Sequence, residues 1–194
     1  MDKAPTKMFV GIRVPTDIAT SLASFRSNYP DDLPGVRWTD PDDLHITLKY
    51  LGRQTTQAAT SITDGLANIS QPPVEIALNG AGVFEDVGVL FIGIATVPAL
   101  MRLQQAVDQV ALGYGVSRSE HPYRPHISIA RFDTENVVPD PTREFDRMSF
   151  RLGEFCQGLP NRHFRATEIV LYDSVSGHYR ERFNLQLNVE AGNF

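Results

Sequence analysis

The sequence holds a single cysteine, Cys156, among its 194 residues. One thiol cannot close a disulfide within the chain, and it cannot supply the several thiolates of a cysteine-type zinc site. No apolar run approaches the ~18 residues that a transmembrane helix requires, and the chain does not open with the basic and apolar regions of a signal peptide. These absences exclude disulfide scaffolds and cysteine-rich zinc modules. A cytoplasmic protein without a membrane partner is expected.

The sequence also has no excess of basic residues. Lys and Arg number 18 and Asp and Glu number 23, which gives a net charge of −5. A broad basic surface for duplex DNA is not expected, although a small basic cleft is compatible with this balance. A phosphate-binding glycine loop, a G-x-S-x-G elbow and an H-E-x-x-H metal motif are all absent. The sequence therefore offers no motif for a P-loop, serine-hydrolase or zinc-protease mechanism.

The composition, with 42% hydrophobic and 21% charged residues, is typical of a globular protein. Strands are predicted over 8–14, 36–38, 44–51, 74–83, 89–96, 126–132, 164–175 and 179–189, and helices over 17–27, 55–68, 98–112 and 144–157. Short links between successive strands favour antiparallel pairing, so an α+β fold of mostly antiparallel sheet with outer helices is expected. No change in composition divides the chain, which predicts a single domain over residues 1–194.

Two of the predicted strands carry the same short pattern. His45 and Thr47 alternate with apolar residues in LHITL, and His126 and Ser128 do so in PHISI. Because side chains alternate along a strand, each strand presents an imidazole and a hydroxyl on one face and two apolar anchors on the other. Such a pair suits the binding of a tetrahedral anion. From the residues alone, an ordinary half-buried strand with a polar face explains the pattern equally well.

The flanks of the two patterns resemble a known family. The stretches VRWTDPDDLHITLKYLG and YRPHISIARF resemble the paired H-x-[ST]-x motifs of the 2H phosphoesterase superfamily, and most closely its RNA 2′,3′-cyclic phosphodiesterase (LigT-like) family. KMFVGIRVP is similar to the family's first strand, and LYDSVSGHYRERFNLQL to its closing strand pair. Ser128 stands where many members have threonine, and residues 133–161 match no part of the family. The resemblance implies two pseudo-symmetric lobes around a central cleft.

The resemblance also implies an activity and the residues that perform it. A 2′,3′-cyclic phosphate at an RNA 3′ end, or in a small cyclic nucleotide, would be hydrolysed to a 2′-phosphomonoester without a metal ion or another cofactor. His45 is implied as the proton donor to the leaving 3′ oxygen and His126 as the base that activates water, since imidazole has an ordinary pKa of about 6.5. Thr47 and Ser128 are implied to hydrogen-bond the non-bridging phosphate oxygens. The protein is expected to be a monomer.

Two further residues are implied to contact the substrate. By analogy with the family, Arg131 would contact the phosphate or ribose, and Tyr50 would stack on a base. Each lies five residues after its histidine, and strict alternation puts that position on the opposite face of the strand. A twist at Gly52, or in the loop after Phe132, is therefore needed to turn both side chains toward the cleft. Lys49 shares the face of His45 by the same counting; it is interpreted as a surface lysine, with a contribution of positive potential to the cleft as the alternative.

Other functions stay open on the sequence alone. A module that binds nucleotide or RNA without catalysis would keep the cleft, but it would not need two intact imidazoles. A phosphodiesterase of small cyclic nucleotides and a ligase forming 2′–5′ links in RNA would use the same groups. A metal-dependent hydrolase would lose activity on chelation. The acidic residues before the first motif, Asp40, Asp42 and Asp43, are interpreted as turn formers rather than as metal ligands.

Overall fold

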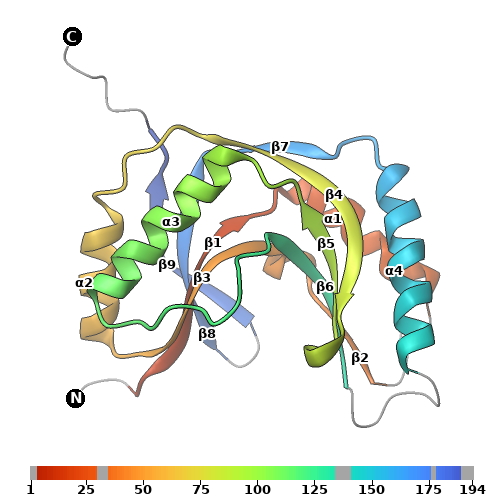
Figure 1. Cartoon of the computed structure of the whole chain (residues 1–194), viewed down its shortest axis with the longest axis horizontal. Coiled ribbons are helices and arrows are strands. Elements are labelled where there is room, and N and C mark those ends of the chain that lie inside the picture. The colour runs from red at the N-terminus through yellow and green to blue at the C-terminus, as the bar shows by residue number, and fades with distance from the viewer. Residues whose placement is uncertain (1–3, 30–34, 134–140, 176–177, 189–194) are drawn as a thin grey trace.

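The computed structural model describes residues 4–29, 35–133, 141–175 and 178–188, and within them the chain forms a nine-stranded sheet flanked by four α-helices (Figure 1). The strand order is β7-β4-β5-β6-β3-β1-β8-β9, and β2 pairs with β6 beside this path. Every pairing between the described strands is antiparallel, which confirms the expected α+β fold. The strands are β1 (Thr6–Arg13), β2 (Val36–Trp38), β3 (His45–Gln54), β4 (Val74–Phe84), β5 (Val89–Ile94), β6 (His126–Phe132), β7 (His163–Ala166), β8 (Glu168–Val175) and β9 (His178–Gln186).

The helices bury one apolar side each. In α3, Pro98 starts the helix without leaving an N–H unpaired, and Leu103 and Val107 follow at helical spacing on the buried side. The helix α2 is capped by Thr55, whose hydroxyl accepts a hydrogen bond from the N–H of Ala58. The helices are α1 (Thr16–Ala23), α2 (Thr56–Leu66), α3 (Pro98–Gly113) and α4 (Pro141–Gln157), with 3-10 turns η1 (Ser24–Asn28), η2 (Pro41–Asp43) and η3 (Glu85–Val87).

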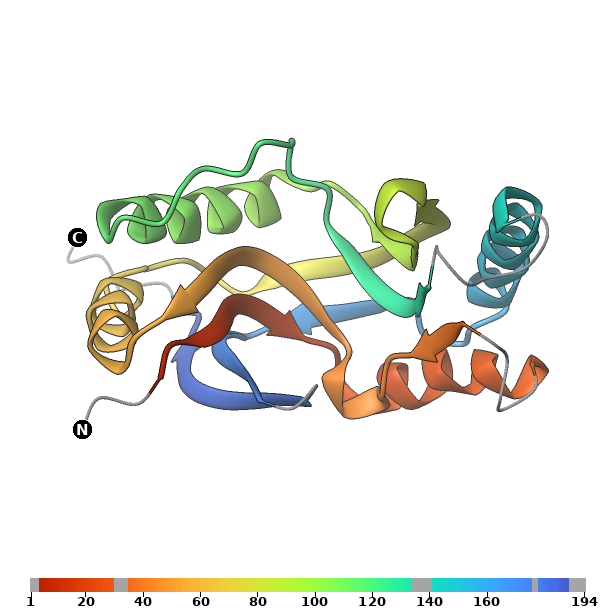
Figure 2. The ribbon, with the colours of Figure 1, turned by 90° about the horizontal axis from the view of Figure 1, so that it is seen from below.

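The two histidine strands, β3 and β6, are neighbours in the middle of the strand order, where two lobes meet. The first lobe holds β1, β3, β8 and β9, and α2 and α3 lie beside it. The second holds β2, β4, β5 and β6, and α1 and α4 lie beside it. The two helix pairs stand at opposite ends of the molecule in Figure 1 and in the perpendicular view of Figure 2. Phe25, just after α1, contacts Phe155 of α4 with ring centroids 5.4 Å apart. This contact holds together the two helices that lie beside the second lobe.

One large cluster of buried apolar side chains extends through both lobes. It includes the apolar anchors of both histidine motifs, Ile46, Leu48, Ile127 and Ile129, each at most 4% exposed. Their burial fixes the register of the two strands, because a slip by one residue would exchange the buried and the polar face. The histidines and hydroxyls are therefore held on the side of the sheet away from this core.

The strand predicted over residues 164–175 is wrong in one respect. The chain forms two strands there, β7 and β8, with Thr167 between them. β7 pairs with β4 in the second lobe, whereas β8 pairs with β1 in the first lobe. The N–H of Leu187 donates to the carbonyl of Thr167 at 2.7 Å, where the chain passes between the lobes. The sequence hides this break because both halves favour strand, and the choice of partner is made by tertiary packing.

Residues 133–161, in which the sequence alone shows no resemblance to the family, contain α4. Residues 134–140, in the loop predicted before this helix, lie outside the described residues. Cys156 on α4 is 4% exposed, and burial raises the pKa of its thiol to about 12, as expected for an inert core cysteine. Among the described helices, none has the length and apolar character needed to cross a membrane.

Candidate active site

β3 and β6 meet at a pair of isoleucines. Ile46 lies opposite Ile127 in an antiparallel register, and both are completely buried. Each isoleucine stands between the imidazole and the hydroxyl of its own motif, so those polar side chains point to the other face of the sheet. The register of this one pair therefore decides which polar residues become neighbours.

Four polar side chains surround the isoleucine pair on that face. In an antiparallel register, the residue before one isoleucine stands level with the residue after the other. His45 is consequently level with Ser128, and Thr47 with His126. All four are half-buried. The structure brings the four predicted residues together in a crossed arrangement, with each imidazole level with the hydroxyl of the other strand.

The two imidazoles are oriented in the same way. Nδ1 of His45 lies 2.7 Å from the carbonyl oxygen of Asp43, and Nδ1 of His126 lies 2.7 Å from that of Arg124. A carbonyl only accepts, so Nδ1 carries the hydrogen and donates in both rings. Nε2 of the neutral ring is then an acceptor, and in His45 it lies 3.1 Å from the hydroxyl of Thr47, which donates to it. Both rings thus keep Nε2 for exchange of a proton.

Aromatic rings enclose His45. Phe9 of β1 stacks on its imidazole with ring centroids 4.4 Å apart, and Tyr179 of β9 meets it edge-on at 5.0 Å. Gly11 makes room for this stack, because a Cβ there would lie 3.0 Å from the carbonyl oxygen of Ile46 and 3.5 Å from the His45 ring. The first lobe therefore holds this imidazole in a tight, mostly apolar setting.

His126 has a similar aromatic wall in the second lobe. Its ring centroid lies 4.9 Å from that of Phe84 and 5.5 Å from that of Phe91, and these two phenylalanines stack on each other at 4.2 Å. The guanidinium of Arg124 lies over the Phe84 ring, 5.0 Å from its centroid. A cationic group is thus fixed next to this imidazole.

Burial lowers the pKa of both histidines. For His45 it lowers the pKa to about 4, against the opposing effect of the Asp43 carbonyl and with help from the charge of His126. For His126 burial also lowers the pKa, the Arg124 carbonyl raises it, and the charges of Arg131 and Arg124 lower it further. Burial is the largest cause for both rings, so the neutral imidazole is the favoured form in each.

Tyr50 and Arg131 lie on the same face as the histidines because both strands contain a bulge. The pairing of β3 with β1 skips Leu48, and the pairing of β6 with β5 skips Ile129. A bulge adds one residue and so reverses the alternation beyond it. Each bulge is the third residue after its histidine, and the fifth residue is exposed on the histidine side. The expectation of a twist at the strand ends is therefore wrong, because the bulges turn Tyr50 and Arg131 to the histidine face.

Lys49 is buried, at 4% exposure, and the interpretation as a surface lysine is wrong. The Leu48 bulge turns it inward, where its ammonium lies 2.6 Å from the carboxylate of Asp108 on α3 and donates to the carbonyl of Ser117 at 2.8 Å. Gln104 of α3 donates to the carbonyl of Leu48 at 3.4 Å. An ion pair with an added hydrogen bond compensates the buried charge. These contacts tie the bulge to α3 and to the segment before β6.

Two pockets lie close to the four polar residues, and one of them includes Thr47 and His126 in its lining. The cleft pocket, of about 710 Å³, is lined by Thr47, His126 and the exposed ring of Tyr50. Its other walls are Leu48, Lys49, Phe84, Asp86, Val87, Gln104, Asp108, Arg118, Ser119, His121, Pro122, Tyr123 and Arg124. The arginine pocket, of about 270 Å³, lies beside His45 and is lined by Arg37, Trp38, Thr39, Asp40, Asp43, Arg131, His178 and Tyr179. The cleft pocket therefore reaches two of the four polar residues directly, whereas the arginine pocket is lined by Asp43 and Tyr179, which contact His45.

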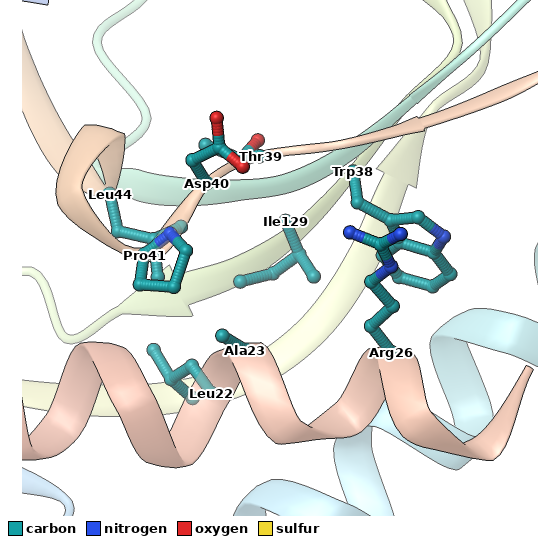
Figure 3. Close-up of a pocket in the computed structure, with 9 residues that line it drawn as sticks. All are labelled: Leu22, Ala23, Arg26, Trp38, Thr39, Asp40, Pro41, Leu44 and Ile129. Carbon is teal, nitrogen blue, oxygen red and sulfur yellow. The ribbon is translucent and has the colours of Figure 1, made fainter. Parts of the chain in front are cut away.

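A further pocket, of about 180 Å³, lies between α1 and the strands β2 and β6 (Figure 3). Leu22 and Ile129 give it apolar walls, while Arg26 and Trp38 stand toward one end of the view. It is lined by Leu22, Ala23, Arg26, Trp38, Thr39, Asp40, Pro41, Leu44 and Ile129. It lacks an imidazole, so we assign no chemistry to it.

Among the described residues, one group gathers side chains of the kind that bind metals. Ligand atoms of Asp40, Asp43 and His178 lie within 4.8 Å of one another. The first two belong to the turn around η2, where the N–H of Asp43 donates to the carbonyl of Asp40 at 3.0 Å, which confirms the turn interpretation. The Asp43 carboxylate also accepts the N–H of Tyr179 at 3.1 Å. The group does not include His45, and it carries no role in the chemistry below.

A family model described as the 2′-5′ RNA ligase superfamily matches residues 14–178, which contain both histidine motifs. The chain belongs to the 2′-5′ RNA ligase superfamily. The resemblance to 2H phosphoesterases, inferred from two short motifs and their flanks, is thereby confirmed.

Curated relatives in this superfamily are named RNA 2′,3′-cyclic phosphodiesterase. The protein of Escherichia coli (strain K12) is 26% identical over 180 residues, covering 92% of this chain and 93% of that protein. The protein of Archaeoglobus fulgidus is 27% identical over 169 residues, covering 85% and 92%. The match to the protein of Geobacillus stearothermophilus covers 63% of this chain and 41% of that relative. A phosphodiesterase class of enzyme is supported at the level of the family.

Solved structures share the fold. A crystal structure of a phosphoesterase superposes with a TM-score of 0.76 at 23% identity, covering 95% of this chain and 99% of that chain. Escherichia coli LigT complexed with 3′-AMP gives a TM-score of 0.75 at 23% identity, covering 94% and 98%. These superpositions establish the LigT-like fold that the motifs implied.

Several residues that shape this superfamily site were not found from the sequence. Asp43 contributes its backbone carbonyl to His45, and any residue type supplies a carbonyl, so no sequence signal exists. Phe9 and Tyr179 reach the same imidazole from strands far along the chain, and Arg37 comes beside Arg131 only through the pairing of β2 with β6. Each depends on a strand register that a single sequence does not specify.

Proposed function

We propose that the protein hydrolyses a 2′,3′-cyclic phosphate at an RNA 3′ end to a 2′-phosphomonoester. The observation that carries the proposal is the shared orientation of His45 and His126, which stand on neighbouring strands with Nδ1 held by a carbonyl and Nε2 available. The names of the relatives, and the 3′-AMP bound to Escherichia coli LigT, support a nucleotide or RNA substrate.

The proposed reaction needs one group to take a proton and another to give one. Nε2 of His126 removes a proton from water as the water oxygen bonds to phosphorus. The bond from phosphorus to the 3′ oxygen breaks, its electron pair stays on that oxygen, and His45 donates the proton that completes the 3′ hydroxyl. Although burial keeps His45 neutral at pH 7, the negative charge of a bound phosphate favours its protonated form. Each transfer typically contributes about 10²–10⁴-fold in rate.

Three further side chains stabilise charge in this scheme. Thr47 and Ser128 donate hydroxyl hydrogens to the non-bridging oxygens, where negative charge grows as water attacks. Arg131, on the same face, provides a fixed positive charge close enough to act on both imidazoles. Because these groups supply both the proton transfers and the charge stabilisation, no step requires a metal ion.

Replacing Tyr50 with alanine is expected to raise KM about 10-fold and to leave kcat within about twofold. Its ring is 55% exposed and lines the cleft pocket. Stacking of a base on an aromatic ring contributes about 1–3 kcal/mol. Steady-state kinetics on an oligonucleotide ending in a cyclic phosphate measure both constants. Phe150→Ala, which removes an aromatic ring that is 66% exposed on α4, is the control. An unchanged KM for Tyr50→Ala would contradict the stacking role.

Excess EDTA is expected to leave the rate unchanged, and the product is expected to carry a 2′-phosphate. The measurement is hydrolysis of the same oligonucleotide with and without EDTA, with the product compared by chromatography with 2′- and 3′-phosphate standards. Loss of activity on chelation would favour a metal-dependent hydrolase. A 3′-phosphate product would reverse the assignment of the leaving oxygen. Binding without turnover by the wild-type protein would favour the non-catalytic module.

Related substrates present the same phosphate to the same groups. Small cyclic nucleotides are hydrolysed by the steps above, and formation of a 2′–5′ link in RNA is the reverse reaction with an RNA hydroxyl in place of water. The single bilobal domain over residues 1–194, the monomeric state and the cytoplasmic location stay predictions.

A further inference from the structure

Two arginines lie directly opposite each other on β2 and β6. Arg37 is the register partner of Arg131, and both are exposed. Directly opposite residues of antiparallel strands point to the same face. The next register pair, Trp38 and Ala130, turns toward the core. Because the bulge in β6 brings Arg131 to the face of the histidines, Arg37 lies on that face as well.

Like charges directly opposite each other on a sheet destabilise the folded state. A bound anion would remove this repulsion between the two arginines. In the described part of the chain, neither Arg37 nor Arg131 has a carboxylate within salt-bridge distance. The exposed arginines of β9 differ, since Arg180 and Arg182 both bind the buried carboxylate of Asp173, at 2.7 and 3.2 Å. Two unpaired guanidiniums on neighbouring strands suit a phosphate, which accepts their forked hydrogen bonds.

The arginine pair stands beside the reaction centre. Arg37 and Arg131 share the arginine pocket with Asp43 of η2 and Tyr179 of β9. These last two contact the imidazole of His45, one through its carbonyl and one through its ring. An anion in this pocket is therefore adjacent to the histidine that is proposed to protonate the leaving oxygen.

A second hollow adjoins the arginine pocket at the two arginines, and neither histidine lines it. This hollow, of about 440 Å³, also touches Val87 of the opposite hairpin and Asp133 beyond β6. Successive phosphates of an oligonucleotide would extend through the arginine pocket toward this hollow, whereas a single phosphate would occupy only the position between the histidines. Arg131 lines both the arginine pocket and this second hollow, so its side chain borders the two spaces.

We propose that Arg37 and Arg131 hold a second phosphate of the substrate, the phosphodiester that joins the terminal nucleotide to the preceding one. The inference rests on the proposed function. A guanidinium has five N–H donors, so Arg131 bridges the reacting phosphate and the next one, while Arg37 serves the next one alone. Arg37 is then the residue that selects an oligonucleotide end over a free nucleoside cyclic phosphate.

Three substrates and two variants test this role. The substrates are a nucleoside 2′,3′-cyclic phosphate, a dinucleotide ending in a cyclic phosphate, and the same dinucleotide with an uncharged methylphosphonate at its internal linkage. Arg37→Ala is expected to raise KM for the charged dinucleotide about 10-fold, with kcat unchanged, and to leave the other two substrates within twofold. Arg151→Ala, at an exposed arginine of α4, is expected to change none of them.

Three results would overturn the proposal. Equal losses on all three substrates would mean that Arg37 acts on the reacting phosphate or on the fold. No loss on the charged dinucleotide would mean that Arg37 does not bind it. A clearly lower unfolding temperature of Arg37→Ala would contradict the argument from charge repulsion, which expects an equal or higher value.

The proposed function fails separately. If the wild-type protein hydrolyses none of the three substrates, the enzyme assignment is lost. The phosphate site is then measured by equilibrium binding of a dinucleotide with a 3′-phosphate end. The second phosphate site is supported if Arg37→Ala binds about 10-fold more weakly than the wild type while Arg151→Ala binds as tightly as the wild type. It is overturned if both variants bind as tightly as the wild type.

Discussion

Replacing His126 with alanine is expected to lower kcat about 10³-fold, and replacing His45 to lower it by a similar factor. Each imidazole supplies one proton transfer, and a loss of that size corresponds to about 4 kcal/mol of barrier. The double variant is expected to be little slower than the slower single variant, because one missing transfer already disables the coupled step. Single-turnover kinetics on an oligonucleotide with a cyclic-phosphate end measure the loss, and equilibrium binding is expected to stay within about threefold.

A substrate with sulfur in place of the bridging 3′ oxygen separates the two roles. A thiol has an ordinary pKa of about 8.5, so the thiolate leaves without receiving a proton. This substrate is expected to restore most of the rate to His45→Ala and none to His126→Ala. Rescue of the opposite variant would exchange the acid and the base. Rescue of neither would remove the acid role from His45, and unchanged kcat in both variants would favour a binding module.

The folded protein is expected to lose about 3 kcal/mol of stability through His45 as the pH falls from 7.5 to 4. Above the ordinary pKa of 6.5 the ring is neutral in both the folded and the unfolded state, so it has no effect. Below 6.5 the unfolded chain binds a proton that the folded protein excludes until the pH reaches the folded pKa of about 4. Each unit of difference corresponds to 1.36 kcal/mol. The lowered pKa of His126 acts in the same direction.

Urea unfolding of the wild type and of His45→Asn at pH 7.5 and pH 4.5 isolates this contribution. The variant keeps a neutral polar side chain at every pH, while the carboxylates titrate alike in both proteins. The difference in unfolding free energy between them is expected to change by about 2–3 kcal/mol in favour of the variant at the lower pH. A change below about 1 kcal/mol would mean that the His45 ring is as well hydrated in the fold as in the unfolded chain.

The expected loss of kcat in His45→Ala and the expected loss of stability at low pH have one physical cause. Packing between Phe9 and Tyr179 fixes the His45 ring for a directed proton transfer, but the same packing removes the water that would stabilise its charged form. A bound phosphate restores the missing counter-charge. The folded protein is therefore expected to resist acid unfolding better when an inhibitor carrying a phosphate is bound, by an amount that grows with the logarithm of the free inhibitor concentration above Kd.

The sequence by itself determined the chemistry-bearing groups and their local face. Alternation along a strand places His45 with Thr47 and His126 with Ser128, because successive side chains point to opposite sides of the backbone. The isoleucines and the leucine that alternate with these polar residues are buried, and they indicate which face of each strand packs on the core. The order of strands and helices, with its short links, likewise decided the α+β class.

Only the tertiary structure decided how these pieces meet. The pairing of β3 with β6, the two bulges that return Tyr50 and Arg131 to the histidine face, and the inward turn of Lys49 all depend on partner strands and on α3. The approach of Arg37 to Arg131 has the same origin. The local sequence specifies which side chains of a strand alternate. The register, the bulges and the partner of that strand are set by the free energy of the whole sheet, to which residues from distant parts of the chain contribute.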